Sequence, residues 1–310
     1  MQDIVQIVIL SRDRPEYLKE AIDSVLSQNL STAVVEIVVS DNSEKNEVEV
    51  MISRNYSNNI KYIRRFPSVS IVKHCQLIVS ECKERYVVLF HDDDIMHPDY
   101  VETMLPFMQQ EDVSAVGCNE FIFSNDFTKS TLGKPHKFNS PKIFNNEKDF
   151  LREYIPSSSG IAAFPGHMYN TECLKKIELN NVRRKGEGGY SDTLLLNTLL
   201  EYGRIIWIPN FLIYYRVGNS KESDNLYMAE HISVLNRMSH VGLDKDNIAV
   251  PMRFAYLLRW FLLQDIKKVF LWKNRTIFKY LFFKSFSLSL QANSWKLLFN
   301  NYYIRRIFSK

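Results

Sequence analysis

The first part of the chain alternates between short, almost purely apolar runs and segments whose apolar residues recur at helical spacing. The apolar runs, rich in Ile and Val, predict buried strands at residues 4–10, 34–43, 60–65 and 85–90. Helical spacing follows the first run, with Pro15 in the first turn, and recurs over residues 70–83. The order β-α-β-α-β-α-β predicts an α/β fold with a mostly parallel, doubly wound sheet between helices.

Beyond residue 100 the pattern becomes less regular. It predicts helices at 100–111 and 194–203, strands at 113–123, 163–170, 204–209 and 211–217, and a polar, poorly patterned segment at 124–148. From about residue 250 the composition is helical and rich in Phe, Leu, Trp and Lys. We therefore expect one α/β domain in residues 1–220 and a helical C-terminal region in residues 221–310.

Polar side chains follow three of the predicted strands. They are Ser11, Arg12, Asp13 and Arg14 after the first strand, Ser40, Asp41 and Asn42 after the second, and His91 to Asp94 after the fourth. In parallel sheets of this kind, ligands bind at the carboxyl ends of the strands. The pattern therefore predicts that these three loops converge on one edge of the sheet.

Asp92, Asp93 and Asp94 form the most informative part of that edge. Three consecutive carboxylates repel one another, and a solvated acidic loop is one explanation. The strand before them is fully apolar, however, and a hard divalent cation such as Mg²⁺ or Mn²⁺ would neutralise the cluster. Such an ion could bridge the two phosphates of a nucleoside diphosphate and stabilise the charge on that leaving group. His91 could be a further ligand or could support one.

Several other classes of protein lack support in the sequence. There is no glycine-rich phosphate loop of a P-loop NTPase or a dinucleotide oxidoreductase, and no GxSxG motif of a serine hydrolase. The four cysteines include no CxxC pair, which favours a reducing compartment. The N-terminus does not resemble a signal peptide, and no run reaches the roughly 18 apolar residues of a spanning helix. We expect a cytoplasmic protein.

The charge of the chain is distributed unevenly. Residues 250–310 carry twelve Lys or Arg and one acid, a net charge of +11, whereas the remainder has 27 basic and 34 acidic residues, a net charge of −7. Basic residues mixed with large apolar ones predict amphipathic helices that lie on an anionic membrane surface. A helical cap packed on the α/β domain is the simpler alternative. Nucleic-acid binding is disfavoured because the body is acidic and no nucleic-acid motif is visible.

Four segments, in order, resemble the glycosyltransferases of family 2, which have the GT-A fold. They are IVQIVILSRDRPEYLKEAIDSVLSQ, EIVVSDNS, ERYVVLFHDDDIMHPDYVE and GYSDTLLLNTLLEYG with the YYR segment after it. Together they span roughly residues 4–220. The third is similar to the family's DxD segment with its trailing proline. The resemblance implies a Rossmann-like GT-A domain, an inverting mechanism and a nucleotide-sugar donor.

The resemblance also implies residue roles. Asp192 would be the general base, although its position before an apolar helix also suits a helix N-cap. Asp94, with Asp92, would hold the metal ion. The donor would be bound by Ser11, Arg12, Arg14, Asp41, Asp92, Asp93 and Arg216, with Asp41 on the uracil or ribose and Arg216 on the diphosphate.

Two positions depart from the family's pattern. Ser191 stands where the family often has Asp or Glu before the base. Val217, Gly218 and Asn219 follow Arg216, where the family often supplies a metal-binding histidine. We expect water or Asn219 to take that place, or the metal to be bound more weakly.

The sequence thus predicts an inverting hexosyl or N-acetylhexosaminyl transferase that uses Mn²⁺ or Mg²⁺ and a UDP-sugar. The expected acceptor is a polyprenyl-linked saccharide in O-antigen or capsule synthesis, reached at the inner face of the cell membrane. A sugar nucleotidyltransferase and a non-catalytic nucleotide-sugar-binding scaffold are the alternatives. The oligomeric state, the donor sugar and the linkage are left open.

Overall fold

The computed structural model describes residues 2–56, 58–123, 140–154, 164–177, 191–216 and 241–242, with the side chains at 152–154, 164, 191 and 192 left out. Its described strands form one nine-stranded sheet in the order β3-β2-β1-β4-β8-β6-β9-β5, and β7 also pairs with β9. Strands β3, β2, β1 and β4 are mutually parallel, as are β6 and β9, whereas β5, β7 and β8 run antiparallel to their neighbours. The expectation of a mostly parallel sheet flanked by helices is confirmed.

The strands that build this sheet are short in the second half of the chain, apart from β6 and β9. Their bounds are β1 Asp3–Ser11, β2 Ala33–Asp41, β3 Lys61–Arg64, β4 Tyr86–His91, β5 Ile95–Met96, β6 Val113–Phe123, β7 Lys142–Phe144, β8 His167–Asn170 and β9 Arg204–Arg216. The described helices are α1 Pro15–Leu26, α2 Glu47–Asn55, α3 Ile71–Glu81, α4 Tyr100–Met108, α5 Glu147–Tyr154, α6 Thr171–Lys175 and α8 Ser191–Leu199, with a short 3₁₀ turn η2 at Phe164–Gly166.

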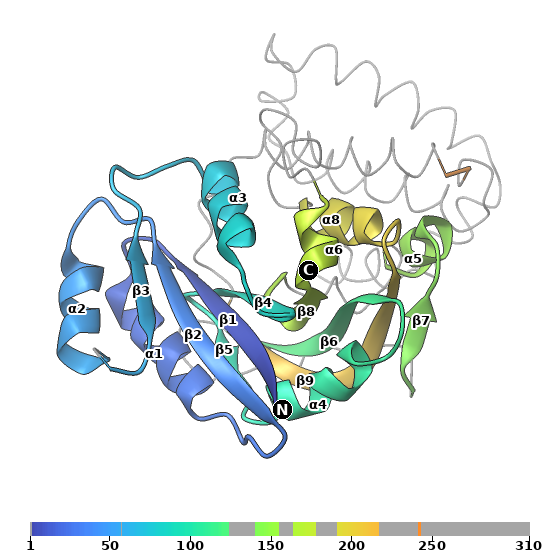
Figure 1. Cartoon of the computed structure of the whole chain (residues 1–310), viewed down its shortest axis with the longest axis horizontal. Coiled ribbons are helices and arrows are strands. Elements are labelled where there is room, and N and C mark those ends of the chain that lie inside the picture. The colour runs from blue at the N-terminus through green and yellow to red at the C-terminus, as the bar shows by residue number, and fades with distance from the viewer. Residues whose placement is uncertain are drawn as a thin grey trace, which may run out of the picture.

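Two cores form because neighbouring strand residues point to opposite faces of the sheet. Val5, Ile7 and Ile9 of β1 belong to the core that α1, α2 and α4 cover. Val8 and Leu10 belong to the other core, which lies beneath α3, α5, α6 and α8. Figure 1 shows α3, α6 and α8 together on one side of the sheet. Burial on both faces explains why the strand sequences read as nearly continuous apolar runs.

The structure differs from the sequence prediction in the second half of the chain. The two strands expected at 204–209 and 211–217 are one strand, β9, which continues through Pro209 while its pairing with β6 shifts register. The polar segment at 124–148 contains β7 at its end, and the strand expected at 163–170 is limited to β8 and preceded by η2. Short elements such as these take their conformation from tertiary pairing, which local pattern does not record.

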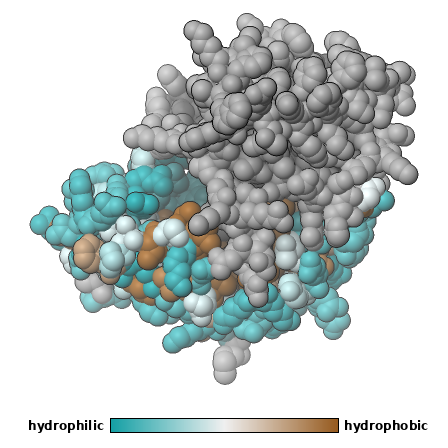
Figure 2. All heavy atoms as spheres, turned by 90° about the horizontal axis from the view of Figure 1, so that it is seen from above, coloured by the Kyte–Doolittle hydropathy of each residue, from teal (hydrophilic) through white to brown (hydrophobic). Residues whose placement is uncertain are grey.

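The division at residue 220 and the helical region after it fall outside the described residues, except for 241–242. Both therefore remain predictions. Among the described helices, none is long and apolar enough to cross a membrane. The described surface seen in Figure 2 is largely hydrophilic, with an apolar area near the middle of that view.

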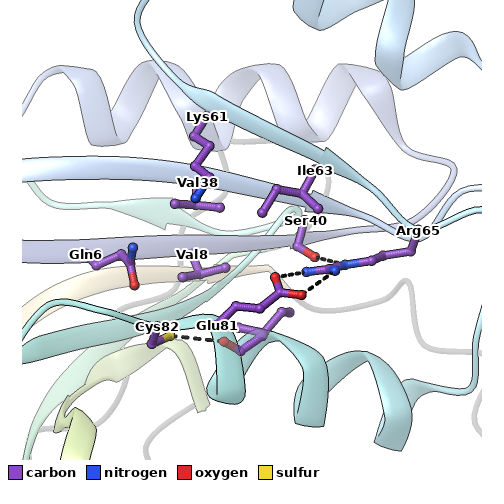
Figure 3. Close-up of a pocket in the computed structure, with 10 residues that line it drawn as sticks. Gln6, Val8, Val38, Ser40, Lys61, Ile63, Arg65, Glu81 and Cys82 are labelled. Atoms are coloured by element: carbon purple, nitrogen blue, oxygen red, sulfur yellow. Dashed lines mark hydrogen bonds and ion pairs between the residues drawn. The ribbon is translucent and has the colours of Figure 1, made fainter.

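A pocket on the α3 side of the sheet, shown in Figure 3, is lined in part by residues that make polar contacts with one another. Arg65 makes two hydrogen bonds of 2.8 and 2.6 Å to the Glu81 carboxylate, and its Nε donates to Ser40 Oγ at 3.1 Å. The same hydroxyl lies 2.8 Å from Nε2 of His74, which is 2% exposed. Burial, together with the charge of Arg65, lowers the pKa of His74 to about 4.

We expect His74 to make the fold sensitive to acid. Its pKa is lower in the folded chain than the usual value near 6.5, so the unfolded chain binds the proton more readily. The stability that neutral His74 contributes is complete above about pH 6.5 and is lost as the pH falls toward 4. Between pH 7.5 and pH 5 this amounts to about 2 kcal/mol. Urea unfolding of wild type and His74→Gln at both pH values measures it.

The Gln variant should lose this part of the pH dependence, because its amide can still bond to Ser40 but does not titrate there. His97→Gln, at a partly exposed histidine of the same molecule, is the matched control and should keep the wild-type pH dependence. Equal pH dependence in wild type and His74→Gln would contradict the prediction.

Candidate active site

The carboxyl ends of β2, β1 and β4 lie side by side in the sheet. Ser11, the last residue of β1, is paired with Asp41 at the end of β2, and Leu10 is paired with His91 at the end of β4. The convergence of three polar loops on one edge is therefore confirmed. It follows from parallel pairing, which brings equivalent ends of neighbouring strands together.

Asp92 is buried on the β1 side of this edge, with 1% of its side chain exposed. The backbone N–H of Arg12 donates to its Oδ2 at 3.0 Å. Arg14 Nη2 lies 2.9 Å from its Oδ1, as an ion pair without hydrogen-bond alignment. Burial raises the pKa of Asp92 to about 6, although the charge of Arg14 and the Arg12 amide act in the opposite direction.

Arg14 joins two of the three carboxylates. Its Nη1 donates to Asp93 Oδ2 at 2.5 Å while its Nη2 faces Asp92. The loop that carries it turns at Asp13, which has a φ of 54° and whose N–H donates to Ser43 Oγ at 2.7 Å. Aspartate is among the few residues that adopt this left-handed conformation readily. The turn places the guanidinium over the aspartate cluster.

Asp94 is held from the opposite side, by β9. The backbone N–H of Arg216 donates to Asp94 Oδ1 at 2.8 Å. The other oxygen, Oδ2, is buried, has no hydrogen-bond partner among the described residues, and lies 3.6 Å from His91 Nδ1. Burial raises the pKa of Asp94, against the effects of His91 and the Arg216 amide. Asp94 thus presents one anchored oxygen and one available oxygen.

His91, Asp93 and Asp94 form the one group among the described residues whose side chains could together hold a metal ion. Their potential ligand atoms lie within 4.8 Å of one another. Metal–ligand bonds to carboxylate oxygen or histidine nitrogen are about 2.0–2.2 Å, so two ligands of one ion can be about 4 Å apart. The sequence prediction gave the ion to Asp94 and Asp92. Asp92 is not part of this group and faces Arg12 and Arg14.

Asp41 is fully buried at the end of β2. Its Oδ1 accepts hydrogen bonds from the backbone N–H of Ser43, at 2.9 Å, and from the Ser43 hydroxyl. Its Oδ2 accepts one from the Tyr62 hydroxyl at 2.7 Å. These bonds fix the carboxylate rigidly beside Ser11. An ionised carboxylate has about four lone-pair sites that can accept hydrogen bonds. The predicted contact of Asp41 with the base or ribose of a donor would use the site that these three bonds leave free.

The remaining residues predicted to bind the donor differ in exposure. Ser11 is buried, whereas the side chain of Arg12 is 53% exposed and lies 3.5 Å from Glu44. Arg216 is buried: its Nε donates to the Asp93 carbonyl at 2.8 Å, and its guanidinium lies behind the aspartate turn. Asp192 lies in the first turn of α8, and its side chain is outside the described part of the structure.

Sequence reasoning missed three residues that surround Arg216. The rings of Tyr17 and Phe123 each lie 4.5 Å from its guanidinium carbon, and Glu20 Oε2 accepts a hydrogen bond from its Nη2 at 2.5 Å. Tyr17 and Glu20 are three residues apart on α1, which places them on the same helix face. That spacing was visible in the sequence. Their partner, almost 200 residues away, was not.

We expect removal of Arg14 to destabilise the protein. In Arg14→Met, the buried Asp92 carboxylate loses its ion pair, which should cost about 1–3 kcal/mol, since Arg14 itself is 39% exposed and partly screened by solvent. In the double variant Arg14→Met/Asp92→Asn the loss should be smaller than the sum of the single losses by about 1 kcal/mol. Chemical denaturation of the four proteins measures this coupling.

Lys19→Met provides the control, because Lys19 forms an ion pair with Asp23 that is about half exposed at both ends. This change should cost less than about 1 kcal/mol. Additive effects of the Arg14 and Asp92 substitutions would show that the two side chains are not coupled.

Comparison with known proteins agrees with this geometry. Residues 6–177, more than half of the chain, match the family described as Glycosyl transferase family 2. No curated protein matches the sequence. Among solved structures, TarS 1-349 of S. aureus in complex with UDP-GlcNAc is 12% identical with a TM-score of 0.58, and covers 93% of this chain and 89% of its own. Mannosyltransferase PcManGT from Pyrobaculum calidifontis, in complex with GDP-Man and Mn2+, is 11% identical with a TM-score of 0.55. The match covers 98% of this chain and 85% of PcManGT.

At these identities the solved structures establish the fold alone, and the family match carries the assignment. The three loop ends that the sheet brings together, Ser11 to Arg14, Asp41 and His91 to Asp94, all lie within the matched residues. The chain belongs to glycosyl transferase family 2, and its fold is that of the GT-A glycosyltransferases.

Proposed function

We propose that the protein is an inverting glycosyltransferase that moves a hexosyl or N-acetylhexosaminyl group from a UDP-sugar to a hydroxyl of a lipid-linked oligosaccharide. The observation that carries the proposal is the buried aspartate turn, in which Asp92 is held by a backbone N–H from the loop after β1 and Asp94 by one from the end of β9, while one Asp94 oxygen stays available. A donor with a diphosphate leaving group is the ligand that such a site, with a cation, would take.

The residues of the turn fit a divalent metal ion. Asp94 Oδ2 is a buried carboxylate oxygen without a hydrogen-bond partner in the described part of the chain, and His91 and Asp93 lie within reach of it. Asp94, Asp93 and His91 would hold the ion, and His91 would take the place of the histidine that is missing after Arg216. The two carboxylates suit Mn²⁺ or Mg²⁺. When bound, the ion supplies Lewis-acid stabilisation of the departing diphosphate.

The chain's own groups would bind and orient the donor around that turn. The Arg14 guanidinium lies directly over Asp92 and Asp93 and would stay close to an incoming diphosphate. Arg12, with its exposed side chain, could close over the donor from the same loop. The rigid Asp41 carboxylate and the Ser11 hydroxyl lie on the β2 side of the cluster, where the nucleoside would be bound.

Asp192 is proposed to be the general base. It would accept the proton of the acceptor hydroxyl while the hydroxyl oxygen attacks the anomeric carbon and the bond to the diphosphate breaks. A single displacement of this kind inverts the configuration of that carbon. General-base assistance is worth about 10²–10⁴ in rate. The location of Asp192 at the beginning of a helix, α8, supports this role, because the helix fixes its backbone.

The donor and the acceptor are proposed from the ligands of similar solved structures and from the charge of the C-terminal residues. TarS is in complex with UDP-GlcNAc and the mannosyltransferase PcManGT with GDP-Man, so uridine and guanosine are the bases to compare. The net charge of +11 in residues 250–310, mixed with large apolar residues, supports contact with an anionic membrane surface. A lipid-linked acceptor in surface-polysaccharide synthesis, at the inner face of the cell membrane, follows from that contact.

The central experiment incubates the purified protein with a panel of UDP- and GDP-sugars, with and without Mn²⁺. We expect Mn²⁺-dependent release of the free nucleoside diphosphate, and we expect Asp94→Asn to lose Mn²⁺ binding, seen by isothermal titration, together with this release. Asp192→Asn should keep Mn²⁺ and donor affinity but, once a hydroxyl acceptor is added, lower kcat for transfer by about 10²–10⁴. Mass spectrometry of the products supplies the readout.

The products also separate the alternatives. Pyrophosphate in place of nucleoside diphosphate would identify a nucleotidyltransferase and sink the proposal. Donor binding without any turnover, equal in wild type and Asp94→Asn, would favour a scaffold. Asp23→Asn, a change of a surface aspartate on α1, is the matched control and should leave binding and turnover as in wild type.

A second prediction concerns the membrane. In the full-length chain, replacing Lys267, Lys268, Lys273 and Arg275 by Gln should weaken binding to vesicles that contain phosphatidylserine, because each basic residue near such a surface contributes about 1 kcal/mol. Vesicle co-sedimentation measures the binding. The variant in which Lys267, Lys268 and Lys273 become Arg keeps the charge and should bind as wild type does. Unchanged binding of the Gln variant would contradict membrane attachment through this region.

A further inference from the structure

Arg216 ends β9, and its position is unusual for an arginine. Its side chain is 3% exposed, although a buried guanidinium needs partners for its charge and its N–H groups. The guanidinium of Arg216 has such partners on three sides. Glu20 of α1 accepts from Nη2, the Asp93 carbonyl accepts from Nε, and the rings of Tyr17 and Phe123 lie at 4.5 Å from the guanidinium carbon.

Two of the contacts of Arg216 reach the aspartate turn itself. The side-chain Nε bonds to the Asp93 carbonyl at 2.8 Å, and the backbone N–H bonds to Asp94 Oδ1 at 2.8 Å. One residue therefore holds both the main chain of the turn and the carboxylate that it presents. Because Oδ1 is occupied in this way, the second oxygen of Asp94 is directed to the side where His91 lies.

The strand that carries Arg216 is tied to the same turn. Immediately after Asp94 the chain forms β5, which pairs with β9 through Ile95 with Tyr214 and Met96 with Ile213. The N–H of His97 also donates to the Leu212 carbonyl at 2.9 Å. The aspartate turn is thus fixed to β9 at successive residues, and Arg216 is the last of these attachments.

We propose that Arg216 is a positioning residue for the metal-binding turn, rather than a ligand of the donor diphosphate. It fixes the Asp93 carbonyl and the Asp94 carboxylate so that Asp94 Oδ2 is directed toward His91, before any nucleotide binds. A guanidinium suits this role better than an ammonium, because its plane can stack between two rings while its edge donates to Glu20 and Asp93. The inference rests on the proposed metal-dependent function and concerns how this chain prepares for the ion.

The test measures binding of Mn²⁺ alone, without nucleotide, from the electron paramagnetic resonance signal of the free ion. Positioning predicts that Arg216→Met lowers Mn²⁺ affinity by about 10–100-fold, the usual effect of removing a group that orients a metal ligand. Arg216→Lys, which keeps the charge but not the planar fork, should recover part of the loss. Glu20→Gln, which removes the charge that anchors the guanidinium, should lower the affinity in the same direction.

Arg64→Lys is the matched control. Arg64 also ends a strand, β3, forms an ion pair with Glu49 and lies 5.1 Å from the Phe66 ring, but it is not part of the aspartate cluster. Its substitution should leave Mn²⁺ affinity unchanged. Circular dichroism and thermal melts of each variant establish that it is folded.

Failure of the positioning role of Arg216 and failure of the proposed metal-dependent function give different results. Unchanged affinity for Mn²⁺ alone in Arg216→Met, with weaker UDP binding at saturating Mn²⁺, would overturn positioning and make Arg216 a diphosphate ligand. If the Arg216 variants do not fold, Glu20→Gln decides, and wild-type Mn²⁺ affinity in that variant overturns the proposal. Absence of Mn²⁺ binding by the wild-type protein would instead refute the metal site itself, and with it both proposals.

Discussion

The burial of two aspartates, Asp92 and Asp94, at the end of one strand is the constraint on which the rest of the site depends. A carboxylate taken out of water needs hydrogen bonds or an opposite charge. Asp92 obtains them from the loop after β1, and Asp94 from the end of β9. The two amides come from residues about 200 positions apart in the chain. The aspartate turn therefore has its present form only when the sheet between β1 and β9 is complete.

The positions of the two arginines at the site follow from the same constraint. Arg14 lies on the β1 side and compensates Asp92 and Asp93, whereas Arg216 supports the turn from the β9 side and is itself compensated by Glu20. One arginine is partly exposed and faces the place where a donor would be bound. The other is buried and faces the protein. Two residues of the same type, both expected to bind the donor, thus occupy different environments, and their chemistry differs accordingly.

Most of the first half of the fold could be predicted from sequence because its strands are buried on both faces. Nearly continuous apolar runs such as residues 4–10 and 85–90 are typical of strands in parallel sheets with both faces covered. The second half of the fold was harder to predict from the sequence. β9 was read as two strands because Pro209 interrupts the apolar pattern, yet the strand continues where its pairing with β6 shifts register. The extent of these elements is determined by sheet pairing, which is a long-range interaction.

The sequence by itself determined the family, the parallel sheet and the sheet edge where the three polar loops meet, because all three depend on local pattern: apolar runs, the polar residues that end them, and the aspartate run. Only the tertiary structure decided which oxygen of which aspartate remains available. That depends on the partners of each carboxylate, Arg12 and Arg14 for Asp92 but His91 and Arg216 for Asp94. Hydrogen bonds between residues far apart in the chain leave no periodic signal in the sequence, so the roles of Arg216 and Glu20 became visible only when β9 was placed beside the turn.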